Sequence, residues 1–159
     1  MTDADGFEIT EPKTEQEIED YYRLRYERLR EPLGLPPGTE REDAIEAAST
    51  HMIVKADGRV VAAGVWAVGM HQDPATGQRV PFVRFRQMAV DPEYEGRGIG
   101  SAMSKHVEAR ARELGATQIV GNVREENVAY FERRGWVVVG PGETLFGTLE
   151  HVAMVKPLS

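Results

Sequence analysis

The stretch RQMAVDPEYEGRGIGSAM, residues 86–103, is the part of the chain that decides the fold. Its pattern predicts the end of a strand, a break at Asp91-Pro92, and a helix opened by glycines 96, 98 and 100. Backbone N–H groups at a helix start, together with the helix dipole, form an anion site, and glycines let a ligand approach the backbone. The stretch therefore predicts a phosphate-binding turn between a strand and a helix.

Three other interpretations of this turn fit less well. A P-loop requires GxxxxGK[ST], and no Lys-Ser or Lys-Thr follows these glycines. A dinucleotide-binding turn requires GxGxxG and an acidic residue about 20 positions later. Here the frame from Gly96 gives GxGxxS, and the next strand ends at Val120-Gly121-Asn122. A tight turn that holds no ligand stays open, although it explains three alternating glycines poorly.

The residues on both sides of the turn predict alternating helices and strands. Thr14 to Glu17 form a capping-box sequence that starts a helix through about Arg30. Asp57-Gly58 is a hairpin signal between two strand-like runs. Hydrophobic periodicity predicts helices over about 15–30, 42–48, 99–114 and 127–134, and strands over 7–10, 51–56, 59–70, 80–90, 117–120, 136–139 and 152–155. This order predicts an α/β (α+β) fold with a mixed, mostly antiparallel central sheet flanked by helices.

Length, charge and composition narrow the class of protein. The 159 residues suit one domain, and the absence of cysteine excludes disulfides and a cysteine nucleophile. A net charge of -7 argues against phosphate neutralisation on nucleic acid. No secretory signal or apolar run of membrane-spanning length is visible, so we expect a cytoplasmic protein without a membrane partner. The four histidines show no ligand spacing, so no metal site is expected.

The negative charge is concentrated in the first 50 residues. They hold fourteen Asp/Glu and six Lys/Arg, whereas the remainder holds twelve and thirteen. A solvated acidic face explains this distribution most simply. A field that attracts a cationic substrate is the alternative.

The stretch from Arg86 to Met103 resembles the acyl-CoA-binding motif of the GNAT N-acetyltransferases. The family pattern [Gln/Arg]-x-x-Gly-x-[Gly/Ala] maps onto residues 95–100, with Glu95 where Gln or Arg is usual. The segment 124–136 resembles a later motif of the family, and residues 147–154 are similar to the ending of small bacterial GNATs of the ElaA type. The resemblance implies a single GNAT domain over 1–159, with six to seven strands and about four helices.

The resemblance also implies a cofactor site for acetyl-CoA as co-substrate. Met88 and Val90 would pair with the pantetheine arm like an added strand, and the N–H groups from Gly96 to Ser101 would hold the pyrophosphate. A carboxylate at Glu95 should cost some affinity unless it points away. The implied cofactor-binding residues are Met88, Ala89, Val90, Glu95, Gly96, Arg97, Gly98, Ile99, Gly100, Ser101, Asn122 and Asn127.

By the same resemblance, a primary amine of a small molecule or peptide attacks the thioester directly in a ternary complex. Candidate residues for the acceptor site are Tyr21, Arg25, Arg28, Gln87 and His151. The base stays open among His51, Gln87 through a water, and His151. Family members often dimerise, so a homodimer is an expectation.

The sequence leaves the general acid for the leaving thiolate open. The family often uses a Tyr four residues before the glycine of the later motif, and Phe131 stands there. The neighbouring Tyr130 is the candidate catalytic residue, with a packing role as the alternative, because neighbours on a helix differ by about 100°. The missing Tyr also motivates a second hypothesis, a non-catalytic acyl-CoA-binding sensor or interaction domain.

Overall fold

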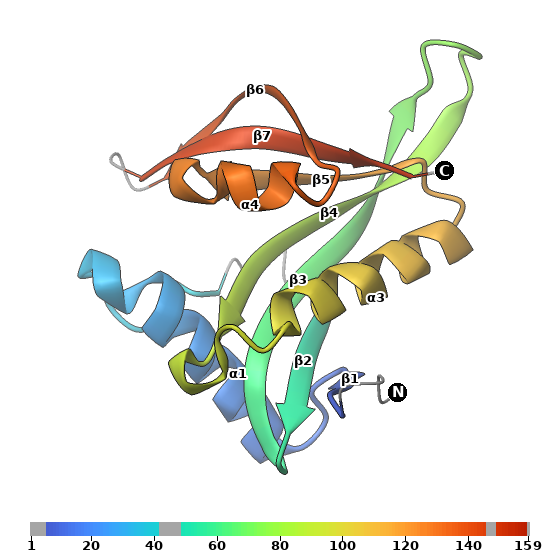
Figure 1. The fold of residues 1–159 in the computed structure, drawn as a ribbon. Coiled ribbons are helices and arrows are strands. Elements are labelled where there is room, and N and C mark those ends of the chain that lie inside the picture. The colour runs from blue at the N-terminus through green and yellow to red at the C-terminus, as the bar shows by residue number, and fades with distance from the viewer. Residues whose placement is uncertain (1–5, 42–48, 146–148, 159) are drawn as a thin grey trace. The chain divides into compact units, whose positions relative to one another are not determined.

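The computed structural model describes residues 6–41, 49–145 and 149–158, and Figure 1 shows its helices and strands. The elements are β1 (Glu8–Thr10), α1 (Glu15–Leu29), η1 (Glu31–Leu33), β2 (Thr50–Ala56), β3 (Arg59–Gln72), β4 (Arg79–Val90), η2 (Pro92–Tyr94), α3 (Ile99–Glu113), β5 (Gln118–Arg124), η3 (Glu125–Asn127), α4 (Val128–Glu132), β6 (Val137–Leu145) and β7 (Leu149–Pro157). The predicted helix over 42–48 lies outside the described residues. In the described ranges, no helix is long and apolar enough to span a membrane.

The seven strands confirm the predicted mixed, mostly antiparallel sheet. They are hydrogen-bonded in the order β1-β2-β3-β4-β5-β7-β6. β4 and β5 pair in parallel, while the β1–β2, β2–β3, β5–β7 and β6–β7 pairs are antiparallel. Two predicted strands are longer than expected, because β6 and β7 form a hairpin that runs well past residues 136–139 and 152–155.

The chain divides into two compact units, which we describe separately. The first comprises Met1–Ala67 and Gln87–Val107, and the second comprises Val68–Arg86 and Glu108–Ser159. β3, β4 and α3 each contribute residues to both units.

In the first unit, α1 packs on the strands through an apolar stripe. The predicted capping box is present: Glu17 N–H donates to Thr14 Oγ1 at 3.0 Å, and Thr14 N–H donates to Glu17 Oε1 at 3.2 Å. Tyr21 and Leu24 of α1 share a core with residues of β2, β3 and β4, namely Ile53, Ala63, Val65 and Ala89. The predicted hairpin is confirmed as well, since Asp57 and Gly58 both have positive φ, at 53° and 73°.

In the second unit, β5 lies between β4 and the β7–β6 hairpin. The β4–β5 ladder consists of Val83–Ile119 and Arg84–Val120, whereas β5 and β7 pair over the whole length of β5. α4 is shorter than the predicted 127–134, because η3 takes up residues 125–127 and Gly135 turns the chain with φ 90°. Trp136 is buried and its ring lies beside the backbone of Gly121 of β5.

α3 follows the predicted apolar spacing with one exception. Ile99, Met103, Val107 and Ala111 are buried, as expected for positions four residues apart on one face of a helix. Leu114, the last residue of the predicted helix 99–114, is 44% exposed because the helix ends at Glu113 and Gly115 takes φ 79°. The helix therefore closes one residue before the last apolar position of the pattern.

Candidate functional site

The glycine-rich turn has two glycines in a left-handed backbone conformation. The turn follows η2, where Asp91 Oδ1 accepts a hydrogen bond from Glu93 N–H at 2.9 Å, and leads into α3. Gly96 and Gly98 have φ of 76° and 83°, a region that residues with a Cβ rarely adopt. A Cβ on either residue would meet no atom within 4 Å. These glycines are therefore required by the backbone conformation, and the space beside them is open to a ligand.

Two residues of the β2–β3 hairpin hold η2 in place. The Tyr94 hydroxyl donates to Asp57 Oδ2 at 3.0 Å, and this hydrogen bond, with burial, raises the pKa of Tyr94 above its usual value. Arg59 pairs with Asp91 and Glu93, each at 3.4 Å. The Arg97 guanidinium lies 4.5 Å from the centroid of the Tyr94 ring. The segment before the turn is thus fixed to the hairpin by a buried ring and by charges.

Glu95, the residue that departs from the family pattern, forms an ion pair with α1. Arg28 Nη2 donates to Glu95 Oε1 at 2.6 Å, and the two side chains are 36% and 56% exposed. Sequence reasoning placed Arg28 among acceptor-site residues and Glu95 among cofactor-site residues, and the structure brings them together. No local pattern indicated this pair, because 67 positions separate the two residues.

The end of β4 contains an irregularity that the sequence did not indicate. Gln87 has φ 53°, which is unusual for a residue with a side chain. The regular alternation of a strand is therefore interrupted immediately before Met88. Met88 and Val90 are half-buried and Ala89 is buried in the core of the first unit. Asp91 N–H, just beyond the strand, donates to Val61 O at 2.8 Å.

Tyr21 and Arg25 form a buried polar cluster with His51. Their exposed fractions are 1% and 0%. Tyr21 Oη lies 2.7 Å from His51 Nδ1, and Arg25 Nη1 donates to the same Tyr21 oxygen at 3.1 Å. Arg25 also donates through Nη2 to the carbonyl of Glu40, so the cluster ties α1 to the segment after η1. The geometry gives Tyr21 and Arg25 a supporting position around His51, while direct contact of either with an acceptor stays a prediction.

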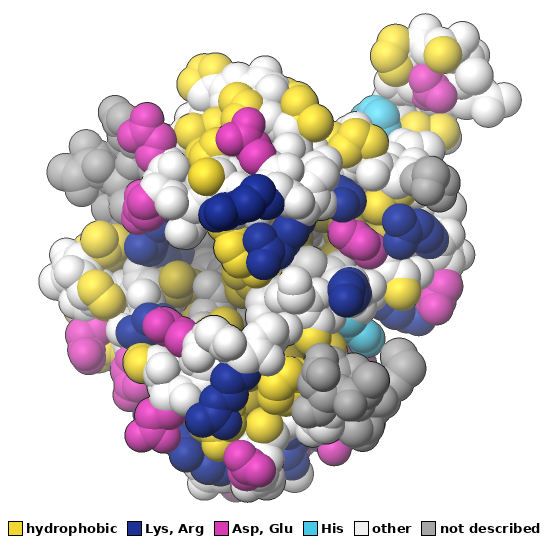
Figure 2. All heavy atoms as spheres, viewed as in Figure 1, with side chains coloured by type: hydrophobic (Ala, Val, Ile, Leu, Met, Phe, Trp, Pro, Cys, Tyr) yellow, Lys and Arg dark blue, Asp and Glu magenta, His cyan; other side chains and the backbone are white. Residues whose placement is uncertain are grey.

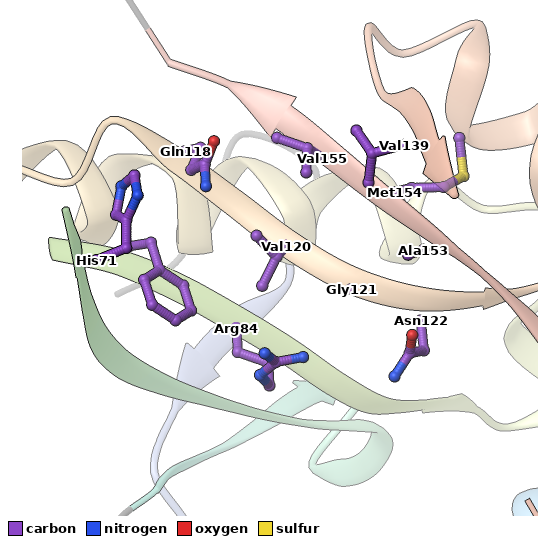
Figure 3. Close-up of a pocket in the computed structure, with 11 residues that line it drawn as sticks. His71, Arg84, Gln118, Val120, Gly121, Asn122, Val139, Ala153, Met154 and Val155 are labelled. Carbon is purple, nitrogen blue, oxygen red and sulfur yellow. The ribbon is translucent and has the colours of Figure 1, made fainter. Parts of the chain in front are cut away.

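The second unit contains a cavity of about 320 Å³ beside β4, β5 and β7 (Figure 3). Val120 and Asn122 project from β5 on the same side as Arg84 of β4 (Figure 3). Its lining also includes His71, whose Nε2 is buried and has no hydrogen-bond partner in the described part of the chain. The lining residues are His71, Phe82, Arg84, Gln118, Val120, Gly121, Asn122, Val139, Ala153, Met154 and Val155. None of them is acidic.

Asn122 lies against the β6–β7 hairpin at a point of very close approach. A Cβ on Gly142 would lie 2.8 Å from Asn122 Oδ1 and 2.9 Å from the carbonyl carbon and oxygen of His151. His151 itself is half-buried and opposite Arg124 in the β5–β7 ladder. Of the residues predicted from sequence, Asn122 and His151 are therefore neighbours of one glycine.

Tyr130 lies on α4 in an aromatic cluster. Its ring meets Phe131 edge to face at a centroid distance of 5.2 Å, and Phe131 meets Trp136 at 5.4 Å. The guanidinium of Arg134 lies 3.5 Å from the centroid of the Tyr130 ring. Asn127 is exposed, and its side chain does not cap α4. These contacts fit the packing role of Tyr130 and leave its catalytic role a prediction.

Charged side chains are mixed over the face shown in Figure 2. Over α1, acidic and basic side chains are interspersed (Figure 2), and several of them form pairs, such as Arg23 with Asp20 at 2.8 Å. Glu17 pairs with Lys55 at 3.0 Å. The acidic excess of the first 50 residues is thus partly compensated within the first unit. Among the described residues, no group of three or more His, Asp or Glu side chains has the arrangement of a metal site.

Comparison with known proteins agrees with the motif geometry. The model of the Acetyltransferase (GNAT) family matches residues 12–136. The uncharacterized N-acetyltransferase YjcF of Bacillus subtilis (strain 168) is 23% identical over 144 residues, covering 91% of this chain and 95% of YjcF.

Two solved structures show the same fold. A GNAT family acetyltransferase from Elizabethkingia anophelis with acetyl-CoA bound has a TM-score of 0.72 at 13% identity, covering 96% of this chain and 98% of that one. Escherichia coli ElaA has a TM-score of 0.68 at 13% identity, covering 94% and 97%. The predicted likeness to ElaA is confirmed at the level of the fold.

Proposed function

Because the chain belongs to the GNAT acetyltransferase family, we propose that it transfers an acetyl group from acetyl-CoA to a primary amine. One observation carries this proposal: Gly96 and Gly98 hold a left-handed backbone at the start of α3, with open space beside both residues. Such a turn presents successive N–H groups to an anion, which suits a pyrophosphate. The family uses acetyl-CoA as the acyl donor, and the acetyl-CoA-bound relative from Elizabethkingia anophelis has the same fold.

The proposed donor site combines the turn with the end of β4. The N–H groups from Gly96 to Ser101 hold the pyrophosphate, the backbone of Met88 and Val90 pairs with the pantetheine arm, and Ala89 lies between them. Asn122 and Asn127 are further proposed contacts of the donor. We also propose that residues 1–159 act as one GNAT domain, because the family match extends over residues of both units.

The proposed reaction is direct attack of the amine nitrogen on the thioester carbonyl, which forms the amide and releases CoA as a thiol. Most of the rate comes from holding amine and thioester together. A lysine-like amine with a pKa of about 10.4 is mostly protonated at neutral pH, so a base has to remove its proton. His51 is the first candidate, because Tyr21 Oη lies 2.7 Å from its Nδ1 and Arg25 donates to that same oxygen. His151, and Gln87 through a water, are the other candidates.

Tyr130 is the proposed source of the proton for the leaving thiolate. Replacing it by Phe keeps the ring and its contact with Arg134, and removes only the hydroxyl. If the hydroxyl acts as the acid, Y130F lowers kcat at least about tenfold and leaves KM for acetyl-CoA within about twofold. An unchanged kcat assigns Tyr130 to packing, and the proton then comes from water or another group.

The acceptor is proposed to be cationic, on the ground of the acidic first third of the sequence. The cavity of the second unit differs from this acidic region in charge. Its lining includes His71 and Arg84 and contains no carboxylate. Initial rates of thiol release with cationic, neutral and anionic amines test the acceptor class. A clear preference for anionic amines would overturn the cationic proposal.

The same assay separates the enzyme from the sensor. Thiol release with at least one amine supports the transferase. Tight acetyl-CoA binding with no turnover on any amine favours the non-catalytic acyl-CoA-binding domain. An absence of any thermal shift with acetyl-CoA would contradict both, since a ligand that binds the folded state must stabilise it.

A further inference from the structure

We propose that Arg28 neutralises Glu95 next to the phosphate-binding turn, which lets a motif that carries a carboxylate bind the pyrophosphate of acyl-CoA. The inference rests on the proposed function and deepens it. It assigns to Arg28 a positioning and charge-balancing role at the donor site in place of the acceptor-site role predicted from sequence.

The charges of the turn are balanced by residues from outside it. Residues 91–101 contain three carboxylates, Asp91, Glu93 and Glu95, and a single basic residue, Arg97. Arg59 of β3 pairs with the first two carboxylates and Arg28 of α1 pairs with the third. Each carboxylate of the segment therefore has an arginine partner, and the Arg28–Glu95 pair is the shortest of these contacts at 2.6 Å.

The packing of α1 explains why Arg28 reaches the turn. Tyr21, Leu24 and Arg25 are buried, and Arg28 follows them at helical spacing on the same face of α1. This face is held against β2 and β3 by the core around Ile53 and Val65. Arg28 lies in the last turn of the helix, where the dipole favours a cation. The buried face of α1 thus delivers a positive charge to the edge of the turn.

The carboxylate of Glu95 is adjacent in sequence to the first N–H group proposed to hold the phosphates. Gly96 follows Glu95 directly, and Glu95 has extended backbone angles, φ -64° and ψ 149°. A pyrophosphate carries two negative charges, so an unpaired carboxylate close to it repels the ligand. With Arg28 bound to it, the Glu95 side chain contributes little net charge. The position that usually carries Gln or Arg in the family then tolerates Glu.

Two other roles for Arg28 make different predictions. If Arg28 leaves Glu95 and binds phosphate itself, its loss weakens binding whether or not Glu95 is present. If Arg28 contacts the acceptor, its loss changes the KM for the amine and not the affinity for acetyl-CoA. Only charge balance predicts that removal of Glu95 rescues the loss of Arg28.

The experiment is a double-mutant cycle on acetyl-CoA affinity, measured by isothermal titration calorimetry. The variants are R28A, E95Q, R28A/E95Q and the conservative R28K. R23A is the matched control, because Arg23 is an exposed arginine of the same helix whose partners are Asp20 and Glu27. Thermal unfolding of each variant without ligand confirms that it folds.

We expect R28A to raise the Kd about three- to tenfold at about 50 mM salt, with a smaller effect at about 500 mM. The Kd of R28A/E95Q should return to within about twofold of the wild-type value. R28K and R23A should each keep a Kd within the same range. A double variant as weak as R28A, or an unchanged Kd in R28A, overturns the inference while the proposed function stands. Failure of the wild-type protein to bind acetyl-CoA removes the proposed function and the inference together. If R28A does not fold, the Kd values of E95Q and R28K/E95Q for acetyl-CoA are measured in its place. A Kd for E95Q more than about threefold above the wild-type value then contradicts the inference.

Discussion

Substitution of Gly98 by alanine tests the phosphate-binding turn against a closely matched control. Gly98 has φ 83° and Gly58 of the β2–β3 hairpin has φ 73°, and a Cβ on either would meet no atom within 4 Å. Alanine in a left-handed conformation costs about 1–2 kcal/mol. G98A and G58A should therefore lose similar stability, which for a chain of this length lowers Tm by about 2–8 °C.

The two variants should differ in their response to acetyl-CoA. Ligand at about 100 times its Kd stabilises the folded state by about 2.7 kcal/mol. G58A should keep this gain, because Gly58 lies in the β2–β3 hairpin and not in the glycine-rich turn before α3. In G98A the new Cβ occupies the open space beside the turn and displaces the phosphates, and we expect the Kd to rise at least about tenfold. The gain at the same ligand concentration then falls to about 1.4 kcal/mol or less.

Differential scanning fluorimetry with and without acetyl-CoA measures both quantities, and calorimetry supplies the Kd. The reasoning is refuted if G98A and G58A show equal ligand-induced shifts at equal loss of intrinsic stability. A much larger intrinsic loss in G98A than in G58A would also contradict it, because the space beside Gly98 would then not be open. Either result would show that the glycines shape the fold without forming the ligand site.

Three further predictions concern stability. Hydrogen bonds from the backbone N–H of Lys13, from the Lys55 side chain and from the backbone N–H of Thr14 lower the pKa of Glu17 to about 2. The resulting stabilisation is present above the ordinary pKa of about 4.3 and is lost as the pH falls through about 2. E17Q should remove this dependence in urea midpoints measured across that range, and equal slopes in both proteins would contradict the assignment. The pKa of Tyr94 is raised by its hydrogen bond to Asp57, so the stability from this neutral hydroxyl is present below about pH 10 and is lost as the pH rises further. Y94F should flatten the alkaline limb of the pH–stability curve, and an unchanged limb would count against the bond. G142A should cost about 1–3 kcal/mol in urea unfolding, because its Cβ would overlap Asn122 and the His151 carbonyl. A loss below about 0.5 kcal/mol would show that the hairpin yields at this point.

Features that depend on residues a few positions apart in the sequence were predictable from the sequence. The capping box at Thr14, the Asp57-Gly58 turn and the opening of α3 after Gly98 all follow from local backbone requirements and appear as predicted. The same holds for the order of the described strands and for the buried stripe of α3 up to Ala111. The resemblance to the GNAT family was also visible in the sequence, and the family model that matches residues 12–136 confirms it.

Other features depend on packing between distant segments and could not be predicted. The positive φ of Gln87 and the length of the β6–β7 hairpin have no local sequence signal. The burial of Tyr21 and Arg25 around His51 depends on how α1 lies on β2. A helical pattern gives the face of α1, but it does not give the partner of each side chain on that face.

The sequence by itself determined that residues 86–103 form the end of a strand, a turn and the start of a helix. It also raised the question of a carboxylate at Glu95 and left it unanswered. The tertiary structure supplied the partner of that carboxylate, because the core of the first unit holds α1 where Arg28 reaches Glu95 at 2.6 Å. Backbone conformation is set by residues a few positions apart, whereas the charge around a site is set by whichever side chains the packing of distant elements brings to it.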